Sequence, residues 1–169
     1  MASDSVISLK GVSIYHSDRS FGHNGGQKAV KHGELVLSDV DLEVGRGELL
    51  YLIGRVGSGK STLLKTLYAE VSLLVGEGRV AGFDLRHLRR RDIPYLRRKI
   101  GIVFQDYQLL GDRNVFMNLY FVMRATGWKD EAEMRRRADE VLNLVGLENK
   151  LYKMPHELSG GEQQRLVIA

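Results

Sequence analysis

The chain has 169 residues, 43 % of them hydrophobic and 27 % charged, with a formal net charge of +4 and no cysteine. This length suits one globular domain with a sizeable core, and the lack of cysteine excludes disulfides and thiolate chemistry. No apolar run approaches the ~20 residues that span a bilayer, and residues 1–5 lack the features of a signal peptide. These observations predict a cytoplasmic protein.

Three basic clusters supply the positive charge: residues 86–91, 97–99 and 135–137. Such clusters can bind nucleic acid or an anionic membrane face. They can also be solvated helix faces whose arginines pair with acidic neighbours such as Asp92 and Asp139. No aromatic residue lies within the clusters, as a stacking platform for bases requires. The solvated face is therefore the favoured interpretation, and no nucleic-acid partner is expected.

The first part of the chain predicts strands separated by a loop. Residues 6–9 form a short strand-like run, and residues 16–32 are polar and glycine-rich, which predicts a loop. Residues 35–44 alternate between apolar and polar side chains with a slip in phase near Ser38, which indicates a half-exposed strand. Residues 49–53 are continuously apolar, a pattern typical of a strand buried on both faces of a parallel sheet.

A helix and two further strands are expected next. Residues 60–70 predict a helix directly after a glycine-rich turn. Residues 80–83 predict a short strand that follows a turn at the glycines 76 and 78. Residues 99–104 form another apolar run, which ends at Gln105 and predicts a further strand.

The last third of the chain predicts helices. Residues 113–128 are expected to form one helix. Asp130 has the position of an N-cap for the next, with Glu133 three residues on, and Gly146 would end that helix. Its buried face is predicted to comprise Met134, Ala138, Val141, Leu142 and Val145.

The glycine-rich turn carries the pattern Gly-x-x-x-x-Gly-Lys-Ser, which is typical of a phosphate-binding P-loop. Gly54, Gly57 and Gly59 leave room for backbone N–H groups to point at an anion, and the helix that follows adds the positive end of its dipole. Lys60 would reach the β- and γ-phosphates, and the Ser61 hydroxyl would coordinate Mg²⁺. A chance match is expected in under about one case in a hundred, so the pattern predicts a nucleoside triphosphate site.

A second string, Leu-Ser-Gly-Gly-Glu-Gln, begins at Leu158. Ser159 and Glu162 have the spacing of a capping box, so an ordinary helix start explains them without a ligand. Gly160 and Gly161 expose backbone N–H groups at a helix N-terminus, which is also a site for an anion. The residues alone leave these two interpretations open. A γ-phosphate shared between two chains would explain why one chain carries two anion sites.

These motifs resemble the ATP-binding domain of ABC ATPases over nearly the whole chain. The P-loop resembles the Walker A motif, residues 104–106 resemble the Q-loop, and residues 158–163 resemble the signature motif, which is specific to this family. Residues 96–106, with the leucines at 109 and 110, most resemble the FtsE-like cell-division branch. The lipoprotein-release and macrolide-export branches are close behind.

The resemblance implies an α/β fold of the P-loop NTPase class with an antiparallel β subdomain and a helical subdomain. It implies one ABC ATP-binding domain over residues 1–169, with the helical subdomain at about 106–158. ATP and Mg²⁺ are the implied cofactors. The implied partners are a second copy, in an ATP-dependent head-to-tail homodimer, and a membrane-spanning, permease-like subunit of the FtsX type. Residues 106 to about 128 would meet that subunit on the inner face of the cell membrane.

The resemblance also implies a role for each matching residue. Tyr15 would stack on adenine, and Gln105 would contact Mg²⁺ or the attacking water. The signature residues Ser159, Gly160 and Gly161 would contact the γ-phosphate bound by a second subunit. The phosphates would be held by Gly54, Gly57, Ser58, Gly59, Lys60, Ser61 and Thr62.

The sequence departs from the family pattern in several places. Val56 replaces a small polar residue in Walker A, Gly111 stands where related sequences often have proline, and residues 16–32 look like an insertion after the adenine-stacking position. The family's Walker B strand, catalytic glutamate, D-loop and switch histidine would all follow Ala169. We therefore expect the C-terminal part of the core to be missing from these residues, and the 169-residue chain to be inactive by itself.

The leading hypothesis is an ABC ATP-binding subunit that couples ATP binding and hydrolysis to a membrane partner in cell division or export. The alternative is a nucleotide-dependent membrane scaffold that does not hydrolyse ATP. A DNA-repair ATPase of the same family would carry a long coiled coil between the Q-loop and the signature. The segment between Gln105 and Leu158 is too short for one and shows no sustained heptads, which disfavours this class.

Overall fold

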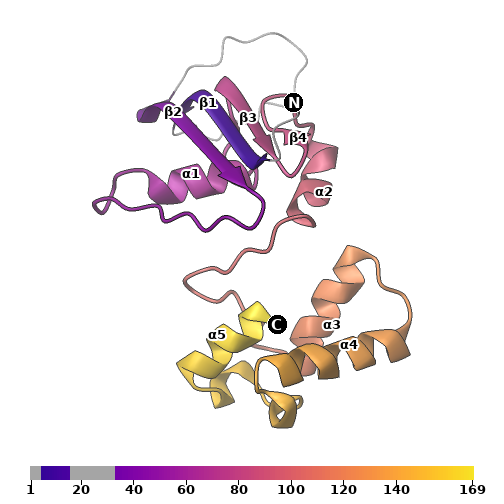
Figure 1. Ribbon diagram of the computed structural model, residues 1–169. Helices are drawn as coiled ribbons and strands as arrows, with labels where there is room; N and C mark the ends of the chain where they lie inside the picture. The colour runs from indigo at the N-terminus through magenta and orange to yellow at the C-terminus, as the bar shows by residue number, and fades with distance from the viewer. Residues whose placement is uncertain (1–4, 16–32) are drawn as a thin grey trace. The chain divides into compact units, whose positions relative to one another are not determined.

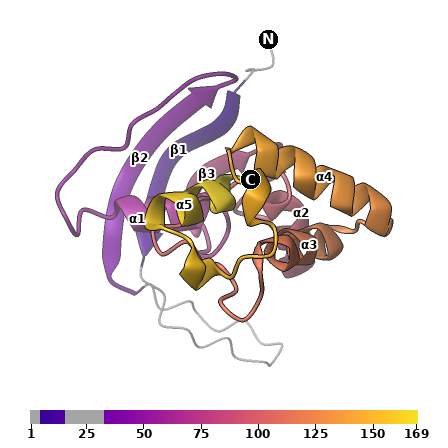
Figure 2. The same ribbon diagram turned by 90° about the horizontal axis from the view of Figure 1, so that it is seen from below.

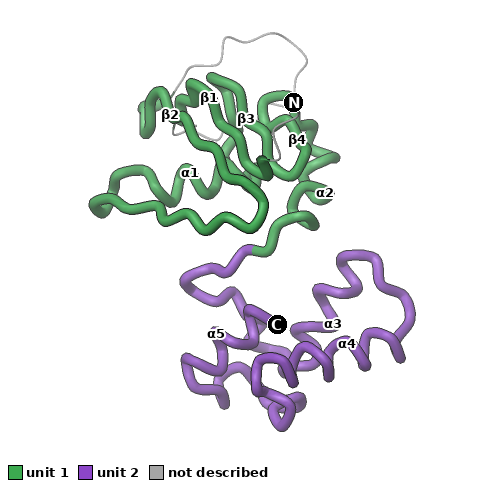
Figure 3. Tube along the Cα trace, in the orientation of Figure 1, with its two compact units in different colours: residues 1–101 green, residues 102–169 purple. Residues whose placement is uncertain are grey.

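The structure is a computed structural model that describes residues 5–15 and 33–169. The loop predicted at residues 16–32 lies outside the described residues. The chain divides into two compact units, Met1–Gly101 and Ile102–Ala169 (Figure 3). Each unit has a hydrophobic core of its own. The helical subdomain predicted at 106–158 falls inside the second unit, which also contains the helix that follows it.

The first unit is built on an antiparallel sheet whose described strands follow the order β2-β1-β3-β4 (Figure 1). The strands are β1 (Ser5–Tyr15), β2 (Leu35–Gly45), β3 (Val75–Val80) and β4 (Phe83–Asp84). The antiparallel subdomain and the strands predicted at 6–9 and 35–44 are confirmed. Strand β1 is longer than expected because its pairing with β2 continues as far as Tyr15.

The slip in phase predicted within β2 is a break in its pairing with β1. Val12 pairs with Val40 and Ile14 pairs with Leu37, so β2 carries one extra residue over this interval. Asp39 lies there with a φ of 52°, in the left-handed region that bulges use. The extra residue turns Leu37 toward the core of the unit.

The core of the first unit lies between the sheet and helix α1 (Lys60–Leu67), which Figures 1 and 2 both place against β1 and β2. Leucine and β-branched side chains of β1 contact Leu63 of α1, and Leu96 of the short helix α2 (Ile93–Arg97) joins them. The buried members are Leu9, Val12, Ile14, Leu63, Leu73, Val80, Leu85 and Leu96. The predicted helix after the glycine-rich turn is thus confirmed, although it ends at Leu67.

The strand predicted at 80–83 is displaced toward the N-terminus. Strand β3 already begins at Val75, and the turn to β4 falls at residues 81–82. Gly76 therefore lies in a strand, with a φ of 89°, and a β-carbon there would overlap the backbone of Gly11 on β1. Gly76 allows strands β3 and β1 to approach closely. From the sequence alone, a glycine of this kind cannot be told from a glycine in a turn.

The two strands predicted at residues 49–53 and 99–104 are wrong. Neither segment pairs with a strand in the described part of the chain, and Tyr51 and Ile53 are 77 % and 89 % exposed. A central parallel strand requires hydrogen-bonded neighbours on both edges. The described sheet is antiparallel throughout, and it supplies neither segment with such a neighbour.

The second unit is helical, as predicted. Its main helices are α3 (Val115–Thr126), α4 (Glu131–Leu144) and α5 (Gly160–Ile168). Their shared core consists of Val115, Leu142, Leu147, Leu151, Leu158 and Leu166. No helix within residues 5–15 and 33–169 combines the length and apolar character that crossing a membrane requires.

Helix α4 begins and ends where the sequence indicates. The Asp130 carboxylate accepts hydrogen bonds from the backbone N–H groups of Ala132, at 2.8 Å, and Glu133, at 3.1 Å. After the helix, Gly146 has a φ of 67°, as a C-terminal glycine often does. Four of the five residues predicted for the inner face are buried, namely Met134, Ala138, Val141 and Leu142. The fifth, Val145, is partly buried against the core.

Candidate functional site

The loop that precedes α1 has the backbone of an anion nest. Gly57 and Gly59 have φ angles of 81° and 87°, and the N–H of Ser58 between them donates to the carbonyl of Arg55 at 3.2 Å. Left-handed residues placed this close together turn successive N–H groups toward one side of the loop. Two of the three glycines predicted for a phosphate cradle, Gly57 and Gly59, thus have left-handed backbones, whereas Gly54 does not.

The end of this loop packs against the start of β2. A β-carbon on Gly59 would lie 2.8 Å from Leu37 Cγ and 3.1 Å from Val36 Cγ1. Gly54 is also crowded, because a β-carbon there would lie 2.8 Å from the Ser58 hydroxyl. Packing and a left-handed backbone thus require glycine at position 59, whereas at position 54 rotation of the Ser58 side chain could make room.

Helix α1 leaves the N–H groups of its first turn available. Among the described residues, no side chain caps its N-terminus at Gly59. The three other long helices differ, since Asn114, Asp130 and Ser159 each accept a hydrogen bond from the first turn. The uncapped donors of α1, together with its dipole, form the set that binds phosphate oxygens at a helix N-terminus.

The side chain of Lys60 lies over the loop. Its ammonium donates to the carbonyl oxygens of Gly54, at 2.8 Å, and Arg55, at 2.7 Å, and lies 3.4 Å from the Ser58 hydroxyl. An ammonium carries three donors and no acceptor, so these contacts hold the positive charge at the mouth of the nest. A phosphate oxygen can replace a carbonyl oxygen as the acceptor.

The residues at the loop also suit a nucleotide-bound Mg²⁺. Ser61 is exposed in the first turn of α1 and offers one hydroxyl ligand. Within residues 5–15 and 33–169, no cluster of three His, Asp or Glu side chains forms a metal site. This donor set does not suit a metal held by the chain alone. It fits Mg²⁺, which usually takes one or two ligands from protein and the others from phosphate and water.

Tyr15 lies at the same end of the first unit as the loop. It is the last residue of β1 and pairs with Leu35 across the sheet. Its neighbour Ile14 pairs with Leu37, which is the side chain that contacts Gly59. The sheet therefore brings this half-buried tyrosine near the candidate phosphate loop, although about forty residues separate them along the chain.

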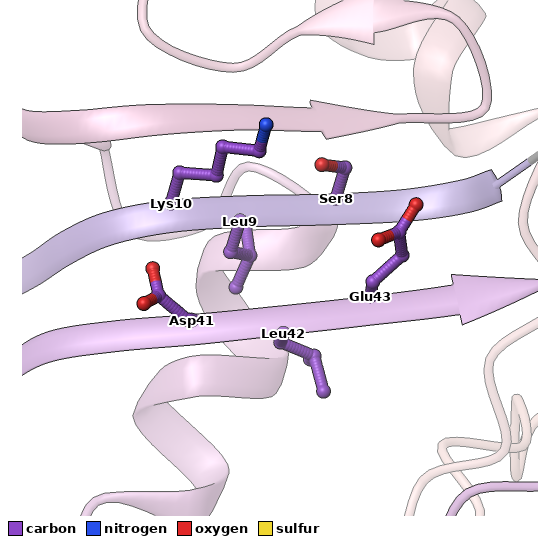
Figure 4. A pocket seen from close by; sticks show the side chains of 6 residues that line it. All are labelled: Ser8, Leu9, Lys10, Asp41, Leu42 and Glu43. Carbon is purple, nitrogen blue, oxygen red and sulfur yellow. The ribbon is translucent and has the colours of Figure 1, made fainter. Parts of the chain in front are cut away.

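A hollow on the sheet is distinct from this loop. It has a volume of about 510 Å³ and is lined by residues of β1 and β2 (Figure 4). The two leucines in Figure 4, Leu9 and Leu42, belong to the core side of the sheet, while Asp41 and Glu43 are exposed. The Asp41 carboxylate accepts a hydrogen bond from Gly11 N–H at 2.7 Å, so it serves the strand pairing. The hollow contains none of the residues predicted to bind a nucleotide.

The Q-loop segment lies at the start of the second unit. Gln105 and Asp106 are exposed, and the next two residues, Tyr107 and Gln108, both have left-handed backbones with φ of 58° and 52°. Non-glycine residues adopt this region at a cost, so neighbouring contacts must hold the turn.

Asn118 anchors the residues that follow this turn, and the sequence analysis missed it. Its side-chain oxygen accepts from Leu110 N–H at 2.8 Å, and its amide nitrogen lies 3.1 Å from the Leu110 carbonyl oxygen. The same nitrogen lies 3.0 Å from the carbonyl oxygens of both Arg113 and Asn114. A polar side chain in the middle of the apolar helix α3 was the signal that could have identified this anchor.

The signature string forms the predicted capping box at the start of α5. Ser159 N–H donates to Glu162 Oε2 at 2.8 Å, and the Ser159 hydroxyl accepts from Glu162 N–H at 3.4 Å. The hydroxyl also donates to Glu162 Oε2 at 2.9 Å, and the Lys150 ammonium lies 3.0 Å from Glu162 Oε1. The Ser159 N–H, then Lys150, then the Ser159 hydroxyl lower the pKa of Glu162 to about 2.

The signature glycines are not required by the fold of this chain. Neither Gly160 nor Gly161 has a left-handed backbone. A β-carbon would lie 3.8 Å from the Tyr107 hydroxyl at Gly160, and 3.8 Å from an Arg165 nitrogen at Gly161, which are ordinary contacts. Alanine in place of glycine at such a position stabilises a protein by about 0.4–1 kcal/mol, because it restricts the unfolded chain. This differs from Gly59, where packing demands glycine.

The predicted site residues thus fall into two groups. The P-loop and Tyr15 belong to the first unit, and Gln105 and the signature string belong to the second. Several arginines of the basic clusters have partners inside their own unit: Arg89 with Asp92, Arg135 with Asp139, Arg137 with Glu140, and Arg97 with the carbonyl oxygens of Tyr68 and Ala69. These contacts support the solvated-face interpretation of the clusters.

Comparison with known sequences gives a consistent result. A family model described as "ABC transporter" matches residues 37–169. The cell division ATP-binding protein FtsE of Streptococcus pneumoniae is 44 % identical over 142 residues, which cover 84 % of this chain and 61 % of that protein. The methionine import ATP-binding protein MetN of Helicobacter acinonychis is 38 % identical over 143 residues, covering 85 % and 43 % respectively. The chain thus spans 61 % or less of the length of these two curated relatives.

Solved structures of similar fold are ATP-binding cassettes. The structure of cbiO1 from Clostridium perfringens, part of the ABC transporter complex cbiONQ, matches with a TM-score of 0.78 and 28 % identity, covering 98 % of this chain and 60 % of that one. The dimeric, post-hydrolysis state of the cassette MJ0796 with ADP and Pi matches with a TM-score of 0.74 and 29 % identity, covering 96 % and 67 %.

Proposed function

This chain belongs to the ABC transporter family, and we propose that it is the nucleotide-binding part of an ATPase subunit that acts with a membrane partner. One observation carries the proposal. The Lys60 ammonium is held at the mouth of a loop with two left-handed glycines, and the helix behind that loop has no side-chain cap among the described residues. This combination supplies positive charge and backbone donors to one anion.

The proposed ligand is ATP. Its phosphates contact the N–H groups of the loop and the first turn of α1, and Lys60 exchanges its carbonyl acceptors for β- and γ-phosphate oxygens. The residues assigned to this contact are Gly54, Gly57, Ser58, Gly59, Lys60, Ser61 and Thr62. Tyr15 stacks on the adenine ring, for which its position at the end of β1 is suitable.

The proposed metal is Mg²⁺, which would offset charge on the phosphates when bound. Ser61 holds it through one hydroxyl oxygen, and Gln105 is assigned to the metal or to the attacking water. In the part of the chain that the structure describes, no group of three or more His, Asp or Glu side chains forms a metal site without phosphate ligands. We expect the full-length protein to hydrolyse ATP.

The proposed assembly is an ATP-dependent, head-to-tail homodimer. In it, Ser159, Gly160 and Gly161 contact the γ-phosphate of a nucleotide bound by the other copy. The signature glycines, which the fold of the chain does not require, support this arrangement because a close anion needs bare backbone at that point. A dimeric cassette among the similar structures gives further support.

The proposed membrane partner is a permease-like, FtsX-type subunit, and the proposed process is cell division. The likeness to the FtsE proteins supports this assignment. Helix α3 carries three exposed apolar side chains, Met117, Phe121 and Val122, which suit a protein contact. The subunit would then lie on the cytoplasmic face of the membrane, with no nucleic-acid partner.

Nucleotide affinity of a Lys60 variant tests the proposal. In the full-length protein, Lys60→Ala should weaken ATP binding about a hundredfold, because it removes a charged donor to two phosphates. The matched control is Lys65→Ala, which removes an ammonium one turn further along α1 that is paired with Glu70 at 3.0 Å. Equal ATP affinity of the two variants in isothermal titration calorimetry would refute the assignment.

ATP turnover by the full-length protein separates the two functional hypotheses. Sustained phosphate release that depends on Lys60 supports the ATPase. Tight ATP binding without turnover, in the presence of the membrane partner, would leave the non-hydrolysing scaffold as the better description.

A further inference from the structure

We propose that Lys150 is a positioning residue of the signature motif, whose ammonium anchors and neutralises Glu162 so that the start of α5 can receive the γ-phosphate of a nucleotide on a second copy. This inference rests on the proposed function, because it concerns the composite site of the dimer. It assigns a role to a residue that lies outside all of the recognised motifs.

The carboxylate of Glu162 contacts Ser159 through one oxygen and Lys150 through the other. One carboxylate oxygen, Oε2, accepts from Ser159 N–H at 2.8 Å and from the Ser159 hydroxyl at 2.9 Å. The other oxygen, Oε1, lies 3.0 Å from the Lys150 ammonium. The side chain of Glu162 is only 19 % exposed, so the pair is partly shielded from solvent. Partial shielding strengthens the effect of one charge on another.

The hydroxyl proton of Ser159 points at Glu162 in this arrangement. Glu162 is ionised at neutral pH, because its contacts lower its pKa to about 2, and an ionised carboxylate can only accept hydrogen bonds. Ser159 is therefore the donor in the 2.9 Å contact between its hydroxyl and Oε2. To bind a phosphate oxygen, which is also only an acceptor, the hydroxyl must turn away from Glu162. Lys150 and the Ser159 N–H then remain to hold the carboxylate.

Besides holding the Glu162 carboxylate, Lys150 neutralises its negative charge. An isolated carboxylate beside Ser159 would repel an approaching γ-phosphate, since both groups are anions. The ammonium of Lys150 cancels that charge at the capping residue itself. The N-terminus of α5 then presents its N–H groups and dipole to the phosphate without a competing negative charge.

The backbone holds Lys150 in place for this contact. It ends the short 3-10 turn Glu148–Lys150, and the residues on either side of that turn, Leu147 and Leu151, are both buried in the core of the second unit. The N–H of Lys150 donates to the Leu147 carbonyl at 2.9 Å. The ammonium thus extends from a fixed point of the same core that buries Leu158 of the signature.

The same segment offers a matched control. Lys153 forms an ion pair of similar length with Glu157, at 2.9 Å, and Glu157 Oε2 accepts from Met154 N–H at 2.7 Å. This second lysine therefore also neutralises a capping glutamate. Its pair caps the short turn Pro155–Glu157 and not the signature helix. Removing either lysine deletes one cation and one ion pair to a capping glutamate.

The test is ATP-dependent dimerisation of the full-length protein, measured by sedimentation velocity at fixed salt. Lys150→Met should weaken the dimer about tenfold, since each of the two composite sites loses a few-fold in affinity, and Lys153→Met should change it less than about twofold. Lys150→Arg should restore the dimer, because it keeps the charge. The ATP affinity of the monomer should be the same in all three variants, because the P-loop belongs to the other unit.

A double-mutant cycle distinguishes charge neutralisation from general weakening of the structure. Glutamine also completes a capping box, so Glu162→Gln keeps the backbone contact and removes the charge. In that background, Lys150→Met should have little effect on the dimer, whereas a merely structural role of Lys150 predicts the same loss as before. Raised salt should also reduce the effect of Lys150→Met by screening.

The outcomes separate this inference from the function on which it rests. A wild-type dimer that forms with ATP, together with equal behaviour of Lys150→Met and Lys153→Met, overturns the inference alone. A loss that persists in the Glu162→Gln background also overturns it. If the wild-type protein forms no ATP-dependent dimer, the composite site is wrong and the inference is wrong with it.

Discussion

Gly59 lies so close to Leu37 that a β-carbon on the glycine would come within 2.8 Å of the leucine Cγ. Leu37 is in turn fixed by its pairing with Ile14 on β1. The conformation of the candidate phosphate loop is therefore set from two directions, by the left-handed φ of its glycines and by the strand behind it. Because the loop is already ordered, little conformational entropy is lost when it binds an anion.

Alanine at Gly59 should destabilise the protein more than alanine at Gly57. Both positions have left-handed backbones, which cost an L-residue about 1–2 kcal/mol. A β-carbon at Gly57 has no neighbour within 4 Å, whereas one at Gly59 collides with Leu37 and Val36 and should cost about 1–3 kcal/mol more. Chemical denaturation of the two variants measures the difference. Equal unfolding free energies would show that the strand does not constrain the loop.

Alanine at Gly160 should have the opposite effect on stability. The position has an ordinary backbone and room for a β-carbon, so Gly160→Ala should stabilise the protein by about 0.4–1 kcal/mol. The same methyl group should block the close approach of a phosphate and prevent the ATP-dependent dimer. Denaturation and sedimentation of one preparation measure both effects. A stabilised variant that still dimerises normally would contradict the role proposed for the signature glycines.

The sequence predicted the elements that local interactions determine. Asp130 and Ser159 are N-caps as expected, because a cap depends only on residues two or three positions away. The apolar runs at 49–53 and 99–104 failed as predictions because a buried strand depends on distant neighbours, and the described sheet provides none. Similarly, the close contact of Gly76 with Gly11 depends on the pairing of β3 with β1, which could not be predicted from the sequence.

The candidate site shows the same division. The P-loop glycines and Lys60 were identifiable because their spacing is itself the chemical signal. The packing of Gly59 on Leu37 depends on the register of β1 with β2, which includes a bulge whose exact geometry the pattern does not specify. Lys150 was not identified, because it reaches Glu162 from a separate turn in the chain.

Asn118 should be a principal anchor of the segment that follows the Q-loop. It is 8 % exposed and bonds both the N–H and the carbonyl of Leu110. Asn118→Ala leaves these partly buried groups without their partner and should cost about 1–3 kcal/mol of unfolding free energy. Hydrogen exchange at the Leu110 amide should become faster in this variant.

The control for that experiment is Asn114→Ala, which removes the cap of the same helix. Its side-chain oxygen accepts from Met117 N–H at 2.8 Å, so the loss should be about 1 kcal/mol without faster exchange at Leu110. Exchange at Leu110 that responds equally to both variants would assign the effect to fraying of α3 and not to the Asn118 contacts.

The capping box at the signature should give a stabilisation that is lost in acid. Because contacts with Ser159 and Lys150 lower the pKa of Glu162 to about 2, the folded state binds a proton less readily than the unfolded chain, whose glutamates titrate near 4.3. The sign follows from linkage: this contribution is complete above about pH 4.3 and disappears as the pH falls through about 2. NMR titration of the Glu162 carboxyl carbon should therefore show a midpoint near the lower value.

Two variants make this titration decisive. Lys150→Met removes the second-largest of the causes, so the midpoint should move upward while the Ser159 backbone contact keeps it below the ordinary glutamate range. Glu162→Gln cannot titrate there, so the stability of the wild-type protein relative to this variant should decline as the pH falls from about 5 to about 2. A Glu162 midpoint near 4.3 in the folded protein would mean that the capping box is open in solution. In that case Ser159 would not be held by Glu162, and the ion pair between Lys150 and Glu162 would not form in solution.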